Sequence, residues 1–380
     1  MASIERRSDR PASGKTWRAR YRDAGGKQHS RSFERKADAQ RWLDEATAGM
    51  VTGTYVDPRA GRITFRDYAE HWRSIQNHRP STADVVERHL RNHVYPAIGS
   101  RPLETLLPSD MRGLVKALSL RLAPATVTLI WRHVSAIMKA AVGDRKIATS
   151  PCTGISVPRA RKTKVVPLST EAVLALADAM PVRHRALVIV ASATGLRQGE
   201  LLGLTVDRID FLRRKVTVDR QLVSVAGSKP EFGPLKTDAS YRTVPLPQIA
   251  VDALAAHLAE FPVGENALVF TSATGLPARR SAIHEEWAAA LRSARRALDE
   301  PLPERVVFHD LRHYYASLLI RFGESVKTVQ ARLGHASAAE TLDTYSHLWP
   351  DSDDRTREAV DAGLGRALAS HVRPTAISAG

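Results

Sequence analysis

The sequence has a single cysteine and no long apolar run, and each absence excludes a class of protein. Cys152 is the only cysteine among 380 residues, so no disulfide can form within the chain and no thiolate metal cluster is available. A reducing cytoplasm fits that composition. The opening residues, MASIERRSDRP, lack the apolar core of a signal peptide. The longest apolar stretch, around Ala186 to Ala193, is too short to cross a bilayer.

Positive charge is what the sequence has in excess. Its 56 Lys and Arg residues outnumber its 40 Asp and Glu residues, which gives a net charge of +16. Basic side chains that meet phosphates release condensed counterions, so such a chain favours a polyanionic partner. Nucleic acid is the first hypothesis and an anionic membrane surface the weaker second. The length is sufficient for two or three domains.

Residues 1–60 predict a small sheet followed by a helix. From Trp17 to Arg22 the side chains alternate, with apolar residues on one face and Arg18, Arg20 and Arg22 on the other. A turn follows, and residues 28–33 can return as the partner strand. A helix from about 36 to 49 then covers the apolar face. The arginine face is either a solvated surface or a surface that lies in a DNA groove.

Residues 63–145 predict a bundle of four short helices, and 146–167 a basic linker. The helix starts are marked by capping residues and a proline: Thr64, Ser81, Ser109 or Asp110, and Pro124. Prolines bound the linker's last part, 156–167, which reads as extended chain. The linker is either a solvated tether or a segment that contacts DNA. Its basic residues are Arg159, Arg161, Lys162 and Lys164.

Residues 168–350 predict a larger mixed domain, before a tail at 351–380. Helices are expected at 169–180, 183–193, 198–204 and 246–260, with strands at 215–223 and 241–246 between them. The whole chain is therefore expected to be mainly α with small antiparallel β-sheets.

Two patterns in this domain place a cation where a phosphate could bind. In Thr194-Gly195-Leu196-Arg197, the arginine stands just before a helix, where it could clamp a phosphate or simply pair with Glu200 on a surface helix. In the segment 234–246, Lys236 precedes a turn and an alternating strand. A mobile ammonium there could act as a general acid.

Two further patterns come from the end of the domain. His309 and Arg312 lie one turn apart at the start of a helix with an apolar stripe that includes Phe322, an arrangement that suits an anion. His335 follows a helix-ending glycine. Tyr345 lies on the next helix, whose start Ser337 and Glu340 could cap.

Together these residues resemble the tyrosine recombinase (phage integrase) family. That family has an arginine after a Thr-Gly break, a β-hairpin lysine, a His-x-x-Arg, a Leu-Gly-His and a tyrosine downstream, in this order. The matching residues are Arg197, Lys236, His309, Arg312, His335 and Tyr345. Lys229 lies near Lys236, but the Lys-Thr and Val-Pro-Leu context favours Lys236. The resemblance also implies that 1–60 is an arm-type DNA-binding domain, 63–145 a helical (SAM-like) core-binding domain and 168–350 the catalytic domain.

The resemblance implies a metal-free and cofactor-free DNA recombinase. Tyr345 would attack a phosphodiester that Arg197, Arg312 and His335 stabilise, while His309 assists proton transfer and Lys236 protonates the leaving oxygen. The expected partners are double-stranded DNA attachment sites and a homotetramer on DNA, with a possible directionality factor or DNA-bending protein. The expected location is the bacterial cytoplasm, beside the nucleoid. The alternatives are an inactive DNA-binding or architectural protein and a type IB topoisomerase.

Overall fold

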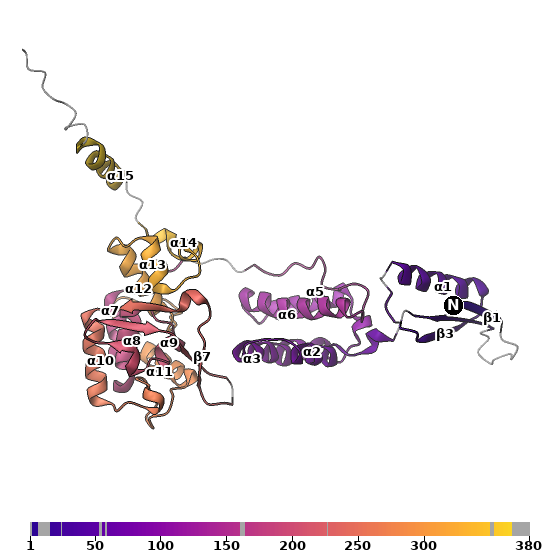
Figure 1. The fold of residues 1–380 in the computed structure, drawn as a ribbon, viewed down its shortest axis with the longest axis horizontal. Helices are drawn as coiled ribbons and strands as arrows, with labels where there is room; N and C mark the ends of the chain where they lie inside the picture. Colours follow the sequence, from indigo (N-terminus) through magenta and orange to yellow (C-terminus); the bar gives the residue numbers. More distant parts are fainter. Residues whose placement is uncertain are drawn as a thin grey trace, which may run out of the picture. The chain divides into compact units, whose positions relative to one another are not determined.

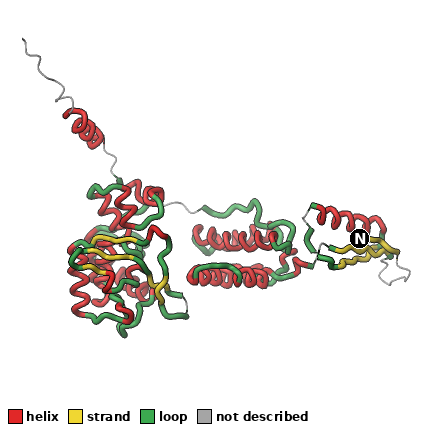
Figure 2. Tube along the Cα trace, in the orientation of Figure 1, coloured by secondary structure: helices red, strands yellow, loops and turns green. Residues whose placement is uncertain are grey.

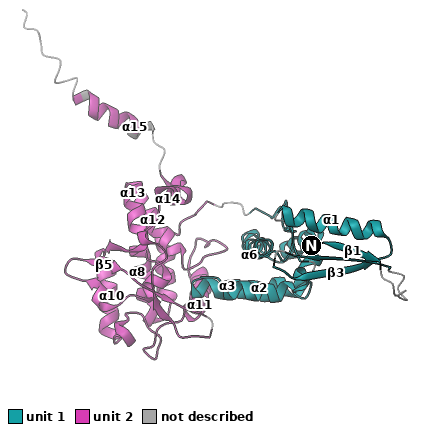
Figure 3. Cartoon of the chain, turned by 45° about the vertical axis from the view of Figure 1, so that its right-hand side comes forward, with its two compact units in different colours: residues 1–162 teal, residues 163–380 magenta. Residues whose placement is uncertain are grey.

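The computed structural model describes residues 2–6, 16–23, 25–52, 55–57, 59–159, 164–225, 227–349 and 353–366. The chain forms two compact units, residues 1–162 and residues 163–380 (Figure 3). Helices dominate both units, and the strands form small antiparallel sheets (Figure 2). This confirms the predicted fold class. No helix in the described ranges is both long and apolar enough to cross a membrane.

The first residues of unit 1 form a three-stranded sheet covered by one helix (Figure 1). Its elements are β1 (Ser3–Arg6), β2 (Trp17–Arg22), β3 (Gln28–Phe33) and α1 (Lys36–Val51). Ala19 and Tyr21 of β2 are buried with Leu43 of α1, as the alternation predicts. The alternating arginines therefore lie on the sheet face away from this core.

The rest of unit 1 is a helical bundle. Its elements are α2 (Phe65–Ser74), α3 (Pro80–His89), a π-helical turn (Leu90–Val94), α4 (Tyr95–Ile98), α5 (Pro108–Ser119) and α6 (Pro124–Gly143), with 3-10 turns at Ala60–Arg62 and Leu103–Thr105. Thr64 caps α2 by accepting from the Asp67 N–H at 3.1 Å, as predicted. The starts of two helices, α3 and α5, were predicted too late. Each helix begins on a proline, which is favoured at the first helical position because it has no N–H that would be left unpaired there. The Asp110 carboxylate then accepts from the Leu107 N–H at 2.8 Å, so Asp110 lies inside α5.

The core of the bundle extends beyond α6. Ile147 and Cys152 are buried in the same apolar cluster as the helices, although both positions fall in the segment predicted as linker. Burial raises the pKa of the Cys152 thiol to about 11. This cysteine is therefore a packing residue with little thiolate at neutral pH.

Unit 2 contains nine helices and five short strands within its described residues. The helices are α7 (Thr170–Ala179), α8 (Val182–Thr194), α9 (Gln198–Leu202), α10 (Gln248–Glu260), α11 (Arg280–Ala297), α12 (Asp310–Arg321), α13 (Val326–Leu333), α14 (Ala338–Tyr345) and α15 (Asp353–Val360). The strands are β4 (Ile209–Asp210), β5 (Lys215–Val218), β6 (Gln221–Val223), β7 (Glu231–Gly233) and β8 (Arg242–Pro245). Short 3-10 or π turns lie at Val206–Arg208, Asp238–Ser240, Glu265–Ala267, Ser346–Leu348 and Asp361–Gly365. The buried helix α8 packs against α7, α10 and α12 and forms the centre of the core.

The strands differ from the prediction in one respect. Residues 215–223 do not form one strand: β5 joins the sheet β4-β5-β8, whereas β6 pairs with β7 in a separate hairpin. The chain leaves the first sheet at Asp219, whose carboxylate binds Arg208 at 2.7 Å and Arg220 at 2.9 Å. These ion pairs interrupt the alternation that suggested a continuous strand.

Two helical features were missed or misread. The helix α11 was not predicted, although Ile283, Trp287, Ala290 and Ala294 are buried at helical spacing. The predicted buried stripe of α12 included Phe322, but this residue is 80% exposed. The helix ends at Arg321, and Gly323 follows with φ +87°.

Candidate active site

The six predicted catalytic residues lie at the ends of helices and in loops of unit 2. Arg197 precedes α9, His309 precedes α12, and His335 follows the glycine that ends α13. Gly195 and Gly334 end α8 and α13 in the left-handed conformation, each with φ +64°. Such turns end the helices sharply and expose their last carbonyl groups to nearby donors.

Arg312 is buried, at 2% exposure, and joins two of these helix ends. Its Nη1 donates to the Gly195 carbonyl at 2.8 Å and its Nη2 to the Leu333 carbonyl at 2.6 Å. Carbonyls at a helix C-terminus carry partial negative charge, which favours a guanidinium there. Arg312 therefore holds the ends of α8 and α13 against α12.

Arg197 reaches the same end of α13. Its Nη2 donates to the Gly334 carbonyl at 3.3 Å, the next carbonyl after the one that Arg312 binds. Its Nη1 donates to Glu200 at 2.8 Å. The Arg197 side chain remains 26% exposed, so it can meet a ligand from solution. The structure thus brings the two predicted arginines together.

Glu200 and Arg242 were missed as parts of this site. The predicted pair of Arg197 with Glu200 forms, but it does not lie on a surface helix, because Glu200 is only 3% exposed. Its carboxylate also accepts from Arg242 Nη2 at 2.9 Å, and Arg242 Nε donates to the Arg332 carbonyl at 2.8 Å. Burial alone would raise the pKa of Glu200. The charges and hydrogen bonds of Arg242 and Arg197 outweigh burial, so this pKa lies below its ordinary value. Glu200 therefore positions both arginines as a buried anion.

The site has more positive than negative charge. Burial, followed by the charges of Arg197 and Arg242, lowers the pKa of Arg312 to about 9. Glu200 pairs with two of the three guanidinium groups, Arg197 and Arg242, so a second anion would relieve the repulsion among the three. Arginine forks also match the oxygen pairs of a phosphate. The electrostatics suit a bound phosphate diester.

Tyr345, the last residue of α14, is 1% exposed and lies beside this group. The ring of His335 stacks near parallel to it, at 6.4 Å between ring centroids. Ser337 caps α14 by accepting from the Glu340 N–H at 3.3 Å, as predicted. Burial raises the pKa of Tyr345 to about 12, and the positive charge of Arg312 opposes this rise.

His335 and His309 are both neutral at physiological pH. Burial, followed by the charge of Arg312, lowers the pKa of His335 to about 4, and its Nδ1 lies 2.8 Å from the Thr341 hydroxyl. Burial and the charges of His313 and Arg312 lower the pKa of His309 to about 4. The His309 residue is nevertheless exposed at the surface.

His313 is a further histidine that the sequence reading missed. Its Nδ1 lies 2.7 Å from the Tyr345 hydroxyl. Its ring stands perpendicular to the ring of His309, with 4.9 Å between the two ring centroids. The signal was present in the sequence, because His313 follows His309 at i+4 and shares its helix face.

Lys236 is exposed in the loop after β7, and within the described residues it has no ion pair or side-chain hydrogen bond. Lys229 lies earlier, in the turn between β6 and β7. Lys236 is closer in sequence to Ser240, which contacts Arg197 at 3.3 Å. Of the two lysines, Lys236 is therefore the one whose loop leads directly to the arginines.

The residues predicted to bind DNA lie in unit 1 and at the start of unit 2. Arg18 and Arg20 are half-buried and Arg22 is exposed; Arg20 pairs with Glu5, and Arg22 donates to the Gly26 carbonyl at 3.2 Å. Among the linker residues, Arg159 and Lys164 are exposed, whereas Arg161 and Lys162 lie outside the described residues.

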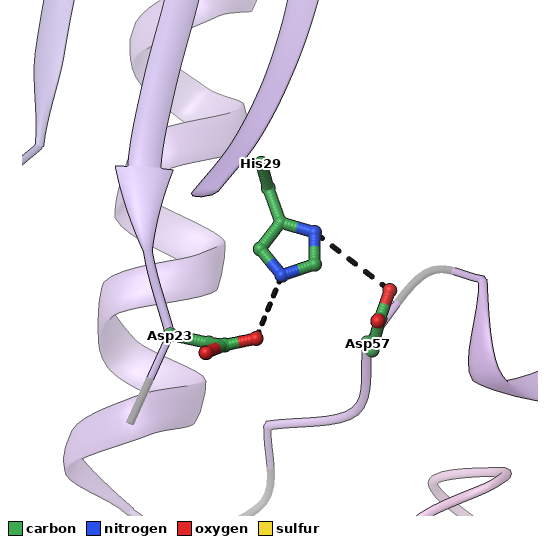
Figure 4. A group of neighbouring side chains, drawn as sticks. All are labelled: Asp23, His29 and Asp57. Atoms are coloured by element: carbon green, nitrogen blue, oxygen red, sulfur yellow. Dashed lines mark hydrogen bonds and ion pairs between the residues drawn. The ribbon is translucent and has the colours of Figure 1, made fainter. Parts of the chain in front are cut away.

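In the described part of the chain, one group of side chains could hold a metal ion: Asp23, His29 and Asp57 (Figure 4). The two carboxylates face opposite ring nitrogens of His29, at 2.7 Å from Nε2 and 3.7 Å from Nδ1. Lys27 already binds Asp57 at 2.5 Å. One ion cannot use both ring nitrogens, so the group fits an ion-pair network better than a metal centre. The hydrogen bond from His29 is the main reason that the pKa of Asp23 is lowered.

Comparison with protein families accounts for most of the chain. The model of the phage integrase family matches residues 162–351, and that of the phage integrase central domain matches residues 65–156. The chain belongs to the phage integrase family. It is a tyrosine-type site-specific DNA recombinase, an enzyme that breaks and rejoins DNA.

Relatives of this integrase align over nearly their full length. A tyrosine recombinase XerC-like protein of Caldanaerobacter subterraneus is 27% identical over 375 residues, covering 90% of this chain and 93% of the relative. The integrase of Mycobacterium phage L5 is 26% identical over 341 residues, covering 87% of this chain and 89% of the relative.

Solved structures share the fold of this integrase. The Tn1549 transposon integrase in complex with a circular intermediate DNA has a TM-score of 0.68 at 22% identity, covering 80% of this chain and 99% of that one. A lambda integrase dimer bound to a COC′ core site has a TM-score of 0.60 at 18% identity, covering 92% of this chain and 99% of that one.

Proposed function

We propose that this recombinase cleaves one DNA strand by attack of Tyr345 on a phosphodiester that Arg197 and Arg312 hold. The observation that carries the proposal is that both arginines donate to consecutive carbonyls, Gly334 and Leu333, at the end of α13. That arrangement fixes two guanidinium groups at one point, and the helix that follows carries Tyr345.

The attack builds negative charge on the nonbridging phosphate oxygens. Charge stabilisation dominates such transfers, and arginine donors in a preorganised position supply it. His335, which follows Gly334 and stacks on the Tyr345 ring, adds an imidazole. These cations and donors do the work that Mg²⁺ does in other enzymes, so we propose metal-independent chemistry.

Proton transfer completes the step. His309 assists it near the nucleophile, and Lys236 protonates the departing 5′ oxygen. The products are a 3′-phosphotyrosyl link and a free 5′-hydroxyl. Because the ester keeps the bond energy, a second 5′-hydroxyl can attack it and rejoin the strand without ATP.

The substrate proposed here is a pair of double-stranded attachment sites. A lambda integrase is described as a tetramer bound to a Holliday junction. Exchange between two duplexes needs four tyrosines, so we infer that this chain also acts as a homotetramer on DNA. A directionality factor or DNA-bending protein would choose between integration and excision. The enzyme would act beside the nucleoid in the bacterial cytoplasm.

The domains divide the DNA contacts in this proposal. Residues 1–60 form the arm-type domain that contacts DNA through Arg18, Arg20 and Arg22. Residues 63–145 form the core-binding domain, and 146–167 the basic linker. Within the linker, the phosphate contacts come from Arg159, Arg161, Lys162 and Lys164. Residues 168–350 form the catalytic domain and 351–380 a tail.

Changing Tyr345 to Phe tests the nucleophile. Incubation of the purified protein with a nicked attachment-site duplex should give a covalent adduct on a denaturing gel for the wild type and none for Y345F. DNA binding in a gel shift should stay unchanged, because the ring still packs. Adducts that survive in Y345F would reassign the nucleophile, and wild-type adducts that disappear in EDTA would overturn the metal-free chemistry.

A further inference from the structure

Among the residues that the structure describes, the hydroxyl of the proposed nucleophile has one side-chain hydrogen-bond partner, His313. The Tyr345 Oη lies 2.7 Å from His313 Nδ1, and the two rings are 5.6 Å apart between centroids. His313 lies on α12, immediately after Arg312, whose guanidinium bridges α8 and α13. The helix that places the phosphate-binding arginine therefore also places an imidazole against the tyrosine hydroxyl.

A buried phenol cannot attack a phosphate efficiently while it keeps its proton. Tyr345 is 1% exposed, and burial raises its pKa to about 12, far above neutral pH. Bulk water cannot freely accept the proton at such a position. An acceptor within hydrogen-bond distance is needed, and general-base assistance of this kind typically contributes ~100-fold or more.

We propose that His313 is the group that takes the proton from Tyr345 during strand cleavage. This rests on the proposed role of Tyr345 as nucleophile. The Oη–H bond breaks and its proton passes to His313 Nδ1, while the Oη–P bond forms and the P–O5′ bond breaks. The leaving 5′ oxygen takes a proton from Lys236. When the strand is rejoined, His313 returns the proton to the tyrosine.

The charges around His313 suit this task. Burial lowers its pKa, Arg312 lowers it further, and Asp310 opposes both. The ring of His309 also faces it, and His309 is neutral because its pKa is about 4. His313 is therefore neutral at physiological pH, and with its proton on Nε2 it offers the Nδ1 lone pair to the tyrosine. Once protonated, it would be stabilised by the negative charge of Asp310.

The other two histidines are placed less well for direct transfer. His335 lies against the Tyr345 ring at 6.4 Å between centroids, and its Nδ1 is occupied by the Thr341 hydroxyl at 2.8 Å. His309 contacts His313, at 4.9 Å between ring centroids. We therefore infer that His309 acts through His313, as a positioning residue for the proton acceptor.

The test measures single-turnover cleavage by His313→Gln and His313→Ala across a pH series. Glutamine keeps a hydrogen-bonding group near Tyr345 but cannot take a proton. Both variants should cleave ~100-fold or more slowly than the wild type at neutral pH. Their rates should keep rising with pH toward the ionisation of Tyr345, whereas the wild-type rate should level off once His313 is neutral. His284→Gln, an exposed histidine on α11, is the matched control and should cleave at the wild-type rate.

A substrate with sulfur at the bridging 5′ position separates the two proton transfers. A thiolate leaves without protonation, so this substrate should restore cleavage by Lys236→Ala but leave the His313 variants slow. Wild-type rate and pH profile in His313→Gln would overturn the proposal, as would recovery of the His313 variants on the sulfur substrate. A gel shift on the same duplex checks that the variants are folded. Failure of the nucleophile assignment is seen separately, as adducts formed by Y345F.

Discussion

At the residue scale, Arg312 has a structural role and a proposed catalytic role that other residue types cannot combine. Its guanidinium is buried and holds the ends of two helices through their carbonyls, and we propose that it also binds the phosphate. A lysine has a single ammonium at the end of a flexible chain, so it cannot span both carbonyls in the plane that a guanidinium provides.

The change Arg312→Lys should therefore abolish most activity while the positive charge is kept. We expect cleavage to fall by ~100-fold or more, as for loss of a preorganised oxyanion donor. The carbonyl left without a partner should lower the free energy of unfolding by about 1–3 kcal/mol. Single-turnover cleavage and thermal unfolding measure the two effects.

Arg321→Lys, at the exposed end of the same helix, is the control and should change neither quantity. Equal activity of Arg312→Lys and the wild type would show that charge alone is sufficient at this position.

At the scale of elements, the site is built from helix ends rather than from helix faces. The αL turns at Gly195 and Gly334 present the carbonyls that the arginines bind. A Cβ at Gly195 would lie 2.3 Å from Cδ1 of Tyr315, and a Cβ at Gly334 would lie 2.9 Å from the Ala239 carbonyl. Glycine is needed at both positions for its backbone conformation and for the lack of space.

The change Gly195→Ala should damage both the fold and the site. The left-handed conformation alone costs roughly 1–2 kcal/mol for alanine, and the clash with Tyr315 adds to it. We expect a lower melting temperature. We also expect the cleavage rate to fall by more than the loss of folded protein explains, because the Gly195 carbonyl is a partner of Arg312.

Gly323→Ala separates the two causes. Gly323 has φ +87°, but a Cβ there meets no atom within 4 Å. It should lose stability from backbone strain alone and keep its cleavage rate. If both variants lose the same stability and activity, then the clash with Tyr315 has no role.

At the scale of the whole molecule, the basic charge is spread over both units, while the six proposed catalytic residues all lie in unit 2. The net charge of +16 is consistent with many phosphate contacts outside the active site. In the N-terminal sheet, Arg18, Arg20 and Arg22 share the face opposite the core formed with α1. This face is the candidate for contact with DNA distant from the cleavage site.

Replacing these three arginines by alanine should weaken binding to distal DNA and flatten its salt dependence. The slope of log K against log salt should become shallower by roughly 0.9 for each phosphate that the variant no longer neutralises. Cleavage of a short core site should remain at the wild-type rate. Fluorescence anisotropy over a salt series measures the slope. Arg41→Ala, exposed on α1, serves as control, and an unchanged slope in the triple variant would leave the face as solvated surface.

Local sequence rules were sufficient for much of the architecture. The alternation around Ala19 and Tyr21, the cap at Thr64 and the proline at the start of α6 each depend on neighbours a few residues away. Helix starts at α3 and α5 were placed one or a few residues late, because a proline at the first position was not weighed against the capping residues beside it. The strand break at Asp219 was missed because its cause, an ion pair with Arg208, lies eleven residues away.

By itself the sequence determined the residue types of the site and their order, from Arg197 to Tyr345, together with the family that this order indicates. It could not show that Arg197 and Arg312 bind adjacent carbonyls, that Glu200 is buried between arginines, or that His313 meets the Tyr345 hydroxyl at 2.7 Å. The physical reason is that these contacts join positions far apart in the chain, and only packing of α8, α12, α13 and α14 around one core decides which of them meet.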